Sequence, residues 1–467
     1  MAVEDATQIR EVVVVGGGIA GLAAAWRLRD HDVLLLEAED RLGGRLRSEV
    51  RGDYWLNFGA HLFPAPGSLV DGMARDCELQ TVPVSGSMMG LAVGRKRMTS
   101  GPVESYPLRM PLPLRDRVAF ARAGLKVQRA VRAYHTVASA KHVSAAELRA
   151  RVLAFEDHRT FAEFLGELPP GAESVFSCAA HRATAELDEL SAGCGIGLFA
   201  LVWGGKGSLI ARNLLGGAGR LPEALGEKLG GRVRTGSRVT GLHPDRGDIV
   251  VEYRSHDGLQ QVRARQVIVA AQAPFAAPLV RPVAAAAGAA LQQLTYGAFL
   301  SVAVETNEQI AMPWDGVYAM ATPGRAFDMF TNQAHALRDD AERRPGGSLM
   351  LFAGGRAAEA LMREEDSVIT KRFLDDLHSL YPESRGVIAD ATVHRWPLGN
   401  VYARPGRARL QAALEGPLGH QRNLHLAGDY FAELGNLEAA ARTGMVAAER
   451  VESLLLERPA EPAHQLT

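Results

Sequence analysis

The chain has 467 residues, of which 47% are hydrophobic and 22% are charged, and its formal net charge at pH 7 is -1. This length exceeds what a single hydrophobic core supports, so we expect two lobes, and the composition is that of a folded globular protein rather than a disordered or fibrous one. Nucleic acid is excluded as a partner, because no basic surplus is available for phosphate contacts.

The cysteines and the apolar segments indicate the redox compartment of the protein and whether it has a membrane anchor. Cys77, Cys178 and Cys194 form no C-x-x-C pair and have no spacing with histidine that is typical of a metal site. We therefore expect a reduced, cytoplasmic environment and no metal. No apolar signal region precedes the first strand, and later apolar segments are interrupted before they reach bilayer-spanning length, so we expect no stable membrane anchor.

The first predicted elements form a strand-helix-strand unit. Residues 12–15 are a β-branched run typical of a buried strand, residues 22–28 are rich in Ala and Leu and predict a helix, and residues 31–37 contain a second apolar strand. Gly16, Gly18 and Gly21 lie between the first strand and the helix in G-x-G-x-x-G spacing.

This glycine spacing has a physical purpose in a dinucleotide-binding unit. Gly16 makes the tight turn, Gly18 lets the backbone approach a pyrophosphate, and Gly21 lets the helix pack on the sheet. The helix N-terminus, which includes Ile19 and Ala20, offers N–H groups and a favourable dipole to phosphate. Glu37, followed by Ala38, ends the second strand where an acid accepts hydrogen bonds from an adenosine ribose.

The rest of the chain alternates between helical and strand-rich regions. Residues 111–201 have long Ala-, Leu- and Arg-rich segments and predict a helical insertion. Strand patterns follow, with a turn at Asp257-Gly258, and a strand and a helix close the chain. The predicted strands are 233–242, 249–253, 262–271, 296–305, 348–352 and 423–429, and the later helices are 367–380 and 438–455.

Residues 37–45 read Glu-Ala-Glu-Asp-Arg-Leu-Gly-Gly-Arg, an E-x-x-x-R-x-G-G-R arrangement. With it, the chain closely resembles the flavin amine oxidase and protoporphyrinogen oxidase superfamily, which includes the carotenoid-type desaturases. The resemblance implies that FAD is the cofactor, that Gly43 and Gly44 let a loop pass close to it, and that Arg41 and Arg45 face phosphate or flavin. A guanidinium suits a diphosphate, which agrees with this role.

Further segments along the chain match the same family. Residues 57–61 resemble the loop beside the isoalloxazine ring, where the family often has Asp instead of Asn57. The resemblance therefore adds Gly59, Ala60 and His61 to the cofactor site. It implies that Val239 contacts the adenine side and that Ala270 belongs to the strand that follows.

The C-terminal region resembles the second FAD fingerprint of the family. Gly428 and Asp429 match its first part, and Asp429 is implied to bind the ribityl or diphosphate region. Asn436 and Leu437 open a helix whose N-terminus is implied to face the flavin pyrimidine. Negative charge develops at that end of a flavin as it accepts hydride, so the helix dipole is favourable there.

Two positions depart from the family pattern. Many amine oxidases of the family carry a lysine near flavin N5, where this chain has Ser301, and an aromatic residue where it has Asn436. Trp396 and Tyr402 remain as candidates for an aromatic wall. The C-terminal third has no cysteine for a thioether link, so we expect FAD to be bound non-covalently.

The sequence thus predicts an α/β flavoprotein: a Rossmann-type FAD-binding domain and an amine-oxidase-like substrate domain of mixed sheet and helices. We assign residues 1–85, 215–285 and 390–460 to the FAD-binding domain, and residues 86–214 and 286–389 to the substrate domain. The ligand is expected between the lobes. The oligomeric state stays open, with a homodimer as one option.

The expected activity is oxidation of a small organic molecule, with a C–N bond of an amine or amide as the leading substrate and O2 as acceptor. His61, Tyr402 and Asn436 are the candidates for catalytic residues. Three alternatives stay open: a desaturase of an apolar polyene or porphyrinogen, a non-redox flavin isomerase or cyclase, and a flavin-bearing protein without catalysis.

Overall fold

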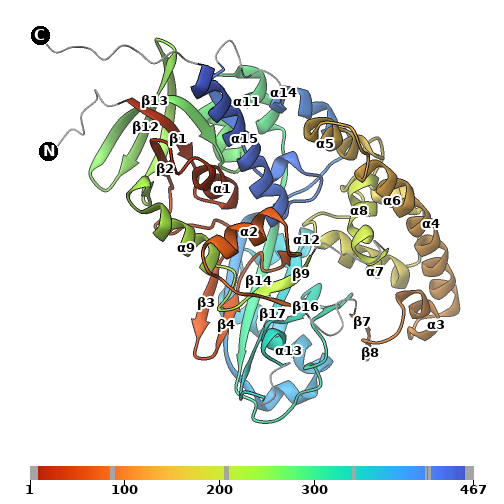
Figure 1. Ribbon diagram of the computed structural model, residues 1–467. Helices are drawn as coiled ribbons and strands as arrows, with labels where there is room; N and C mark the ends of the chain where they lie inside the picture. Colours follow the sequence, from red (N-terminus) through yellow and green to blue (C-terminus); the bar gives the residue numbers. More distant parts are fainter. Residues whose placement is uncertain are drawn as a thin grey trace, which may run out of the picture.

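The computed structural model describes residues 9–84, 90–203, 210–338, 343–415, 418 and 422–457. Figure 1 shows a sheet with packed helices near the two chain ends, a second sheet below it, and an arc of helices on one side. Among the described helices, none combines the length and the hydropathy that crossing a bilayer requires.

The first sheet has seven strands in the order β10-β2-β1-β13-β12-β11, and β19 also pairs with β13. Its central strands pair in parallel, whereas β11, β12 and the first half of β13 are antiparallel. The strands are β1 (Ile9–Val15), β2 (Val33–Leu36), β10 (Val233–Arg234), β11 (Arg238–Asp245), β12 (Asp248–Ser255), β13 (Gly258–Val269) and β19 (Leu424–Leu426).

Both faces of this sheet are buried, which is why its central strands are apolar without alternation. Val12 and Val14 face one core, and Val13 and Val15 face the other. The first core is covered by α1 (Ile19–Arg27), α2 (Leu69–Asp76), α9 (Arg220–Leu229) and α15 (Leu437–Glu457), and the second by α10 (Ala273–Val280), α11 (Ala285–Gln292) and α14 (Gln411–Glu415).

The second sheet has seven strands in the order β18-β14-β17-β16-β15-β7-β8. One of its faces packs against two helices around a core that includes Phe330 and Phe373. The strands are β7 (Gly90–Val93), β8 (Lys96–Met98), β14 (Tyr296–Thr306), β15 (Ala319–Ala321), β16 (Met329–Asn332), β17 (Gly347–Gly354) and β18 (Ile388–Val401), and the helices are α12 (Gly355–Leu361) and α13 (Asp366–Leu380).

The predicted insertion is helical, and it forms the arc in Figure 1. Its helices are α3 (Tyr106–Arg109), α4 (Leu114–Ala138), α5 (Ala145–Ala154), α6 (Phe161–Leu165), α7 (Pro170–His181) and α8 (Ala192–Trp203). Of these, α4, α6, α7 and α8 share a core that includes Phe161 and Phe176.

The small strands elsewhere are the hairpin of β3 (Ser48–Arg51) and β4 (Tyr54–Asn57) and the sheet of β5 (Phe63–Pro64), β9 (Ile210–Leu214) and β6 (Thr81–Pro83).

One long strand escaped the sequence analysis. Strand β18 contains Pro397, which lacks the N–H that a regular ladder requires. The structure places this proline in a register shift, where Trp396 pairs with Phe299 and Asn400 pairs with Gly297. A proline inside a strand pattern argues against a strand, so periodicity alone gives no signal here.

This strand also affects the division into domains. Residues 390–401, which the sequence analysis assigns to the FAD-binding domain, lie in the second sheet, and α11, assigned mostly to the substrate domain, packs on the first. We therefore propose that both boundaries shift, with α11 joining the FAD-binding domain and the last crossing to that domain following Val401.

Helix α15 brings the C-terminal region onto the N-terminal unit through a glycine contact. A Cβ at Gly444 would lie 2.0 Å from the carbonyl oxygen of Ala20 in α1. Real Cβ atoms do not approach backbone oxygen this closely, so any side chain there would push the two helices apart. The close approach of α1 and α15 therefore requires glycine at position 444.

We predict that Gly444→Ala destabilises the protein by about 1–3 kcal/mol or prevents it from folding, because the clash is with backbone. The matched control is Gly124→Ala in α4, where a Cβ meets no atom within 4 Å. The control is expected to be neutral or to stabilise by up to about 1 kcal/mol, the helix preference for alanine over glycine. Thermal unfolding of both variants is the measurement, and equal midpoints would contradict the packing argument.

Candidate FAD and substrate site

The glycine turn after β1 leaves open space at the N-terminus of α1. Gly16 has a φ of +106°, which favours glycine, and a Cβ there would lie 3.0 Å from the carbonyl oxygen of Ala270. A Cβ at Gly18, the N-cap of α1, would meet no atom within 4 Å, and no side chain among the described residues caps this helix. The turn therefore presents an uncapped helix N-terminus toward open space, as a phosphate requires.

Glu37 lies at the end of β2, where its carboxylate is held by the backbone. It accepts hydrogen bonds from the N–H of Gly17 at 2.5 Å and from the N–H of Glu39 at 2.8 Å. The segment that leads to Val239 runs alongside, since the N–H of Ser237 donates to the carbonyl of Glu37 at 2.7 Å. The residues expected at the adenosine end, including Ala38, thus lie in neighbouring segments.

The loop with the paired glycines passes directly over the glycine turn. The N–H of Gly43 donates to the carbonyl of Gly17 at 2.8 Å, and Gly44 is exposed with only the Cα of Gly18 near its Cβ position. Arg41 donates at 2.7 Å to the carbonyl of Gly44. This arginine therefore fixes the shape of its own loop.

Arg45 connects this loop to the C-terminal fingerprint. Its guanidinium forms an ion pair with Asp429 at 2.7 Å and donates to the carbonyl of Gly399 at 3.2 Å. Asp429 is 4% exposed, and a carboxylate buried so deeply needs a partner of opposite charge. Gly428, just before it, is held by the hydroxyl of Thr443 in α15.

The loop at residues 57–61 is held at one carbonyl oxygen. The oxygen of Phe58 accepts hydrogen bonds from Ser301 Oγ at 2.7 Å and from Trp396 Nε1 at 2.8 Å. Ser301 is fully buried, so its hydroxyl serves as a clamp on this loop. Gly59 allows the close fit, since a Cβ there would lie 2.1 Å from the carbonyl oxygen of Arg45.

The same loop offers an open face at Ala60, which is exposed although Gly59 and His61 on either side are buried. Gly18 and Gly44 also border open space, since a Cβ at Gly18 would meet no atom within 4 Å and one at Gly44 only the Cα of Gly18 at 3.6 Å. The donor set agrees with FAD: a helix N-terminus for phosphate, an acid for ribose and an exposed loop for the ring. The residues present therefore fit the cofactor.

His61 is buried, and one of its nitrogens lacks a partner. Nδ1 lies 2.9 Å from the carbonyl oxygen of Gly59, so in the neutral ring Nδ1 carries the proton and Nε2 is an acceptor. Nε2 has no hydrogen-bond partner among the described residues. Burial lowers the pKa of His61, and the positive charge of Arg182 lowers it further. The imidazole is therefore neutral at pH 7.

Asn436 and Tyr402 have structural contacts of their own. Asn436 is exposed, and its Oδ1 accepts from the N–H of Ala439 at 2.8 Å, which makes it the N-cap of α15 ahead of Leu437. Tyr402 is buried in the core of the insertion, and Arg404 donates to its hydroxyl at 2.8 Å. Neither contact indicates a catalytic group.

An apolar wall lies on the face of the second sheet that α12 and α13 leave free. The rings of Phe299 and Phe352 are 4.8 Å apart at their centroids. Leu62, next to His61, packs against the same cluster. We call these three residues and the others of the cluster the apolar wall: Val84, Tyr318, Ala319, Ala321, Met329 and Met350.

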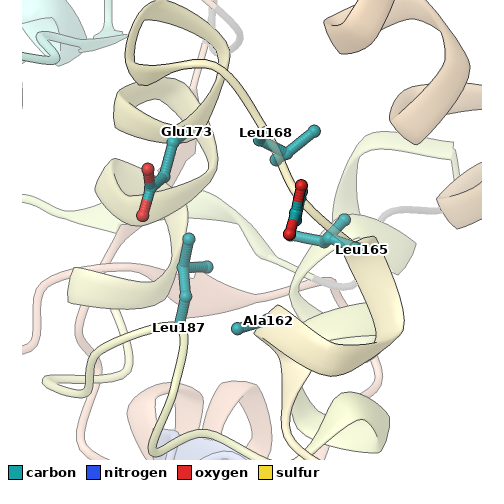
Figure 2. A pocket seen from close by; sticks show the side chains of 7 residues that line it. Ala162, Leu165, Leu168, Glu173 and Leu187 are labelled. Carbon is teal, nitrogen blue, oxygen red and sulfur yellow. The ribbon is translucent and has the colours of Figure 1, made fainter.

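A separate hollow lies on the insertion, between α6 and α7 (Figure 2). Leu165 and Leu168 line one side of it and Glu173 the other. It shares no residue with the positions expected to hold FAD, so it does not belong to that site. Its full lining is Ala162, Leu165, Gly166, Glu167, Leu168, Glu173 and Leu187.

Comparison with known proteins identifies the family. A family model described as flavin containing amine oxidoreductase matches residues 19–452. The chain belongs to this family. FAD is accordingly the cofactor of this flavin-containing amine oxidoreductase, and the resemblance and the amine-oxidase-like fold expected from the sequence are confirmed.

Solved structures agree over nearly the whole chain. A putrescine oxidase bound to putrescine has a TM-score of 0.76 and 18% sequence identity, covering 96% of this chain and 99% of its own. Cyclohexylamine oxidase from Brevibacterium oxydans IH-35A has a TM-score of 0.75 and 16% identity, covering 96% of this chain and 100% of its own. At such identities the similarity establishes the fold alone.

Curated relatives match over short segments. L-amino acid oxidase Cdc18 of Crotalus durissus cumanensis is 40% identical over 73 residues, which are 15% of this chain and 15% of that protein. The flavin-containing amine oxidase A of Bos taurus is 41% identical over 86 residues, which are 17% of this chain and 16% of that protein. These matches cover about one sixth of the relatives' length.

Two features that bear on the loop at residues 57–61 have no signal in the sequence. The carbonyl of Phe58 is a backbone atom, so no residue type signals its role. Arg182 lies in the insertion, far in sequence from every cofactor motif, and its positive charge lowers the pKa of His61. Its position among many arginines on helical segments gave no signal that sequence alone could separate from a solvated surface.

We predict that Glu37→Leu lowers FAD retention by about 10- to 100-fold, because the carboxylate would no longer accept hydrogen bonds from ribose. The measurement is the ratio of oxidised-flavin absorbance to protein after gel filtration. The matched control is Glu39→Leu, since this neighbouring carboxylate is exposed and pairs with Arg41 at 3.3 Å. Undiminished flavin in the Glu37 variant would refute the placement of the adenosine end.

Proposed function

We propose that this enzyme oxidises a C–N bond of an amine, with O2 as the electron acceptor. The observation that carries the proposal is His61, a neutral buried imidazole with a free acceptor nitrogen, on the loop expected beside the flavin. Membership of the amine oxidoreductase family supports the same reaction. In this reaction the amine loses a hydride and a proton to give an imine, and O2 is reduced to hydrogen peroxide.

When bound, FAD supplies the hydride acceptor. We propose that FAD is held by the cofactor-binding residues predicted from the sequence, the first of which is Gly16 and the last Leu437. The chain contributes position and electrostatics. Ser301 and Trp396 fix the loop that carries His61 through the carbonyl of Phe58. Asn436 caps α15, whose N-terminus favours negative charge at the flavin pyrimidine.

We propose that His61 Nε2 accepts a hydrogen bond from the N–H of the substrate amine. A neutral amine is required for hydride loss, and an acceptor nitrogen that is itself unprotonated suits that need. Because burial lowers the pKa of His61, the imidazole keeps this acceptor somewhat below pH 6.5. The apolar wall supports the carbon skeleton of the substrate and excludes water.

The alternative of an apolar polyene or porphyrinogen substrate is less well supported. Such a substrate calls for an uncharged lining, whereas the insertion brings the cation Arg182 within electrostatic reach of His61. Ser301, in place of the family lysine, is engaged with Phe58 and offers no charge of its own.

We predict that anaerobic addition of primary amines bleaches the oxidised-flavin band of the purified protein, and that air restores the colour with formation of one hydrogen peroxide per imine. Polyenes and porphyrinogens, added in the same way, are the comparison. Bleaching by these compounds and not by any amine would favour the desaturase reading, and turnover without loss of O2 would favour a non-redox flavoenzyme.

We predict that His61→Phe slows anaerobic flavin reduction by about 100- to 10,000-fold, the usual contribution of a positioned acid or base. FAD content should be retained. The only hydrogen bond that the described structure gives the His61 side chain is local, from Nδ1 to the carbonyl oxygen of Gly59, so its loss removes no contact with a distant segment. The control is His256→Phe, which alters an exposed histidine in the hairpin between β12 and β13. Equal reduction rates in both variants would remove His61 from the mechanism.

A further inference from the structure

The outer edge of the helical insertion carries exposed apolar side chains. Leu108 in α3 is 77% exposed, and in α4 the exposed fractions are 72% for Leu114, 53% for Leu125 and 40% for Val118. Figure 1 shows α3 and α4 at the rim of the molecule, on the side of the insertion turned away from the two sheets. Single exposed apolar residues are ordinary, but four of them in two adjoining helices indicate a contact surface.

The exposed residues of α4 lie along one side of the helix. The opposite side packs in the core of the insertion through Ala123, Val127 and Val131. Residues at intervals of three or four share a side of a helix, and six exposed residues follow one another in this way. We call them the outer face of α4: Leu114, Val118, Arg122, Leu125, Arg129 and Arg132.

Leu108 is held outward by its neighbours in α3. Tyr106 and Met110 are buried in a cluster of their own, which fixes this short helix on the insertion. Arg117, in the first turn of α4, donates to the carbonyl oxygens of Pro107 at 2.6 Å and of Leu108 at 2.7 Å. The exposed position of Leu108 beside the start of α4 is therefore fixed by the structure, and it extends the outer face.

The outer face of α4 is also positively charged. Helix α4 contains five arginines and one lysine but a single acid, Asp116. The carboxylate of Asp116 accepts a hydrogen bond from the N–H of Gly171 at 3.1 Å, so this acid is turned toward α7. Arg122, Arg129 and Arg132 form no ion pair with any residue that the structure describes. The outer face therefore presents uncompensated positive charge beside its apolar side chains.

This combination of side chains favours a lipid surface over a second copy of the chain. A symmetric dimer that pairs the outer face with itself would bring the arginines of both copies together, which like-charge repulsion disfavours. A bilayer with anionic headgroups takes both kinds of side chain, because leucines enter the boundary of the acyl chains while guanidinium groups reach the phosphates. A helix at the rim of the molecule can lie flat on such a surface.

We propose that the outer face of α4, together with Leu108, binds the surface of a bilayer that contains anionic lipids. Helix α4 lies in the plane of the headgroups, with its leucines toward the acyl chains and its arginines on the phosphates. The contact is peripheral, because it uses one side of a helix whose other side stays packed in the insertion. It involves none of the cofactor-binding residues and does not rest on the proposed amine oxidation.

The experiment measures co-sedimentation of the FAD-loaded protein with vesicles, and no turnover is required. Vesicles of phosphatidylcholine alone are compared with vesicles of phosphatidylcholine and phosphatidylglycerol in equal parts. The protein should bind the anionic vesicles at least about 10-fold more tightly, and should lose most of this preference when NaCl rises from about 50 mM to about 500 mM. No binding, or equal binding to both kinds of vesicle, would overturn the proposal without any variant.

Arginine variants then locate the charge. The double variant Arg122→Gln/Arg129→Gln should bind anionic vesicles about 30-fold more weakly, or about 5-fold for each arginine. The matched control is Arg246→Gln/Arg372→Gln, which removes the same charge from exposed positions in the turn between β11 and β12 and in α13. The control should bind as the wild type does. An equal loss in both pairs would mean that net charge alone attracts the protein, and it would overturn the proposal.

Leucine variants test the apolar part of the contact. The double variant Leu114→Ser/Leu125→Ser should bind anionic vesicles about 10-fold more weakly or worse, with its thermal midpoint kept because both residues are exposed. The matched control, Leu259→Ser/Ile310→Ser, changes residues that are 56% and 73% exposed elsewhere and should bind as the wild type does. Unchanged binding in the α4 pair would indicate a purely ionic attraction and overturn the proposal. A wild-type dimer that this pair converts to monomer, with no vesicle binding, would overturn it in favour of an interface between copies.

Discussion

The ion pair between Arg45 and Asp429 is the interaction on which the site depends. It joins two residues that are 384 positions apart, and Arg45 also holds the carbonyl of Gly399, so three chain segments meet at one guanidinium. A buried carboxylate without its partner would be strongly destabilising, so the segments must come together. The close packing of α1 and α15 at Gly444 supports the same assembly. The proposed FAD site therefore depends on the complete fold.

The carbonyl of Phe58 shows how this chain replaces features of its family. Ser301, at the position where the resemblance implies a lysine in many amine oxidases, donates to this oxygen together with Trp396. Both bonds hold the loop that carries His61. Asn436, at the position where the resemblance implies an aromatic residue in many amine oxidases, caps α15. Ser301 and Asn436 thus each form a local structural contact in this chain.

Most of the cofactor motifs lie around the first sheet. The loop at residues 57–61 and the apolar wall, which is the proposed substrate side, lie against the second sheet. A fold of this kind serves many reactions because the substrate side varies independently of the cofactor side. The anchoring of His181 and Thr184 against Gly354 and Gly297 gives the insertion a fixed position on that sheet.

By itself, the sequence determined the strand-helix-strand unit with its glycines, the helical insertion, the strands of the first sheet and the FAD family, because these depend on local periodicity and on fixed spacings between neighbours. Only the tertiary structure decided the place of β18, the clamp at Phe58 and the cap at Asn436. Those features depend on contacts between residues far apart in the chain. A local sequence pattern does not indicate which distant residue a buried polar group contacts.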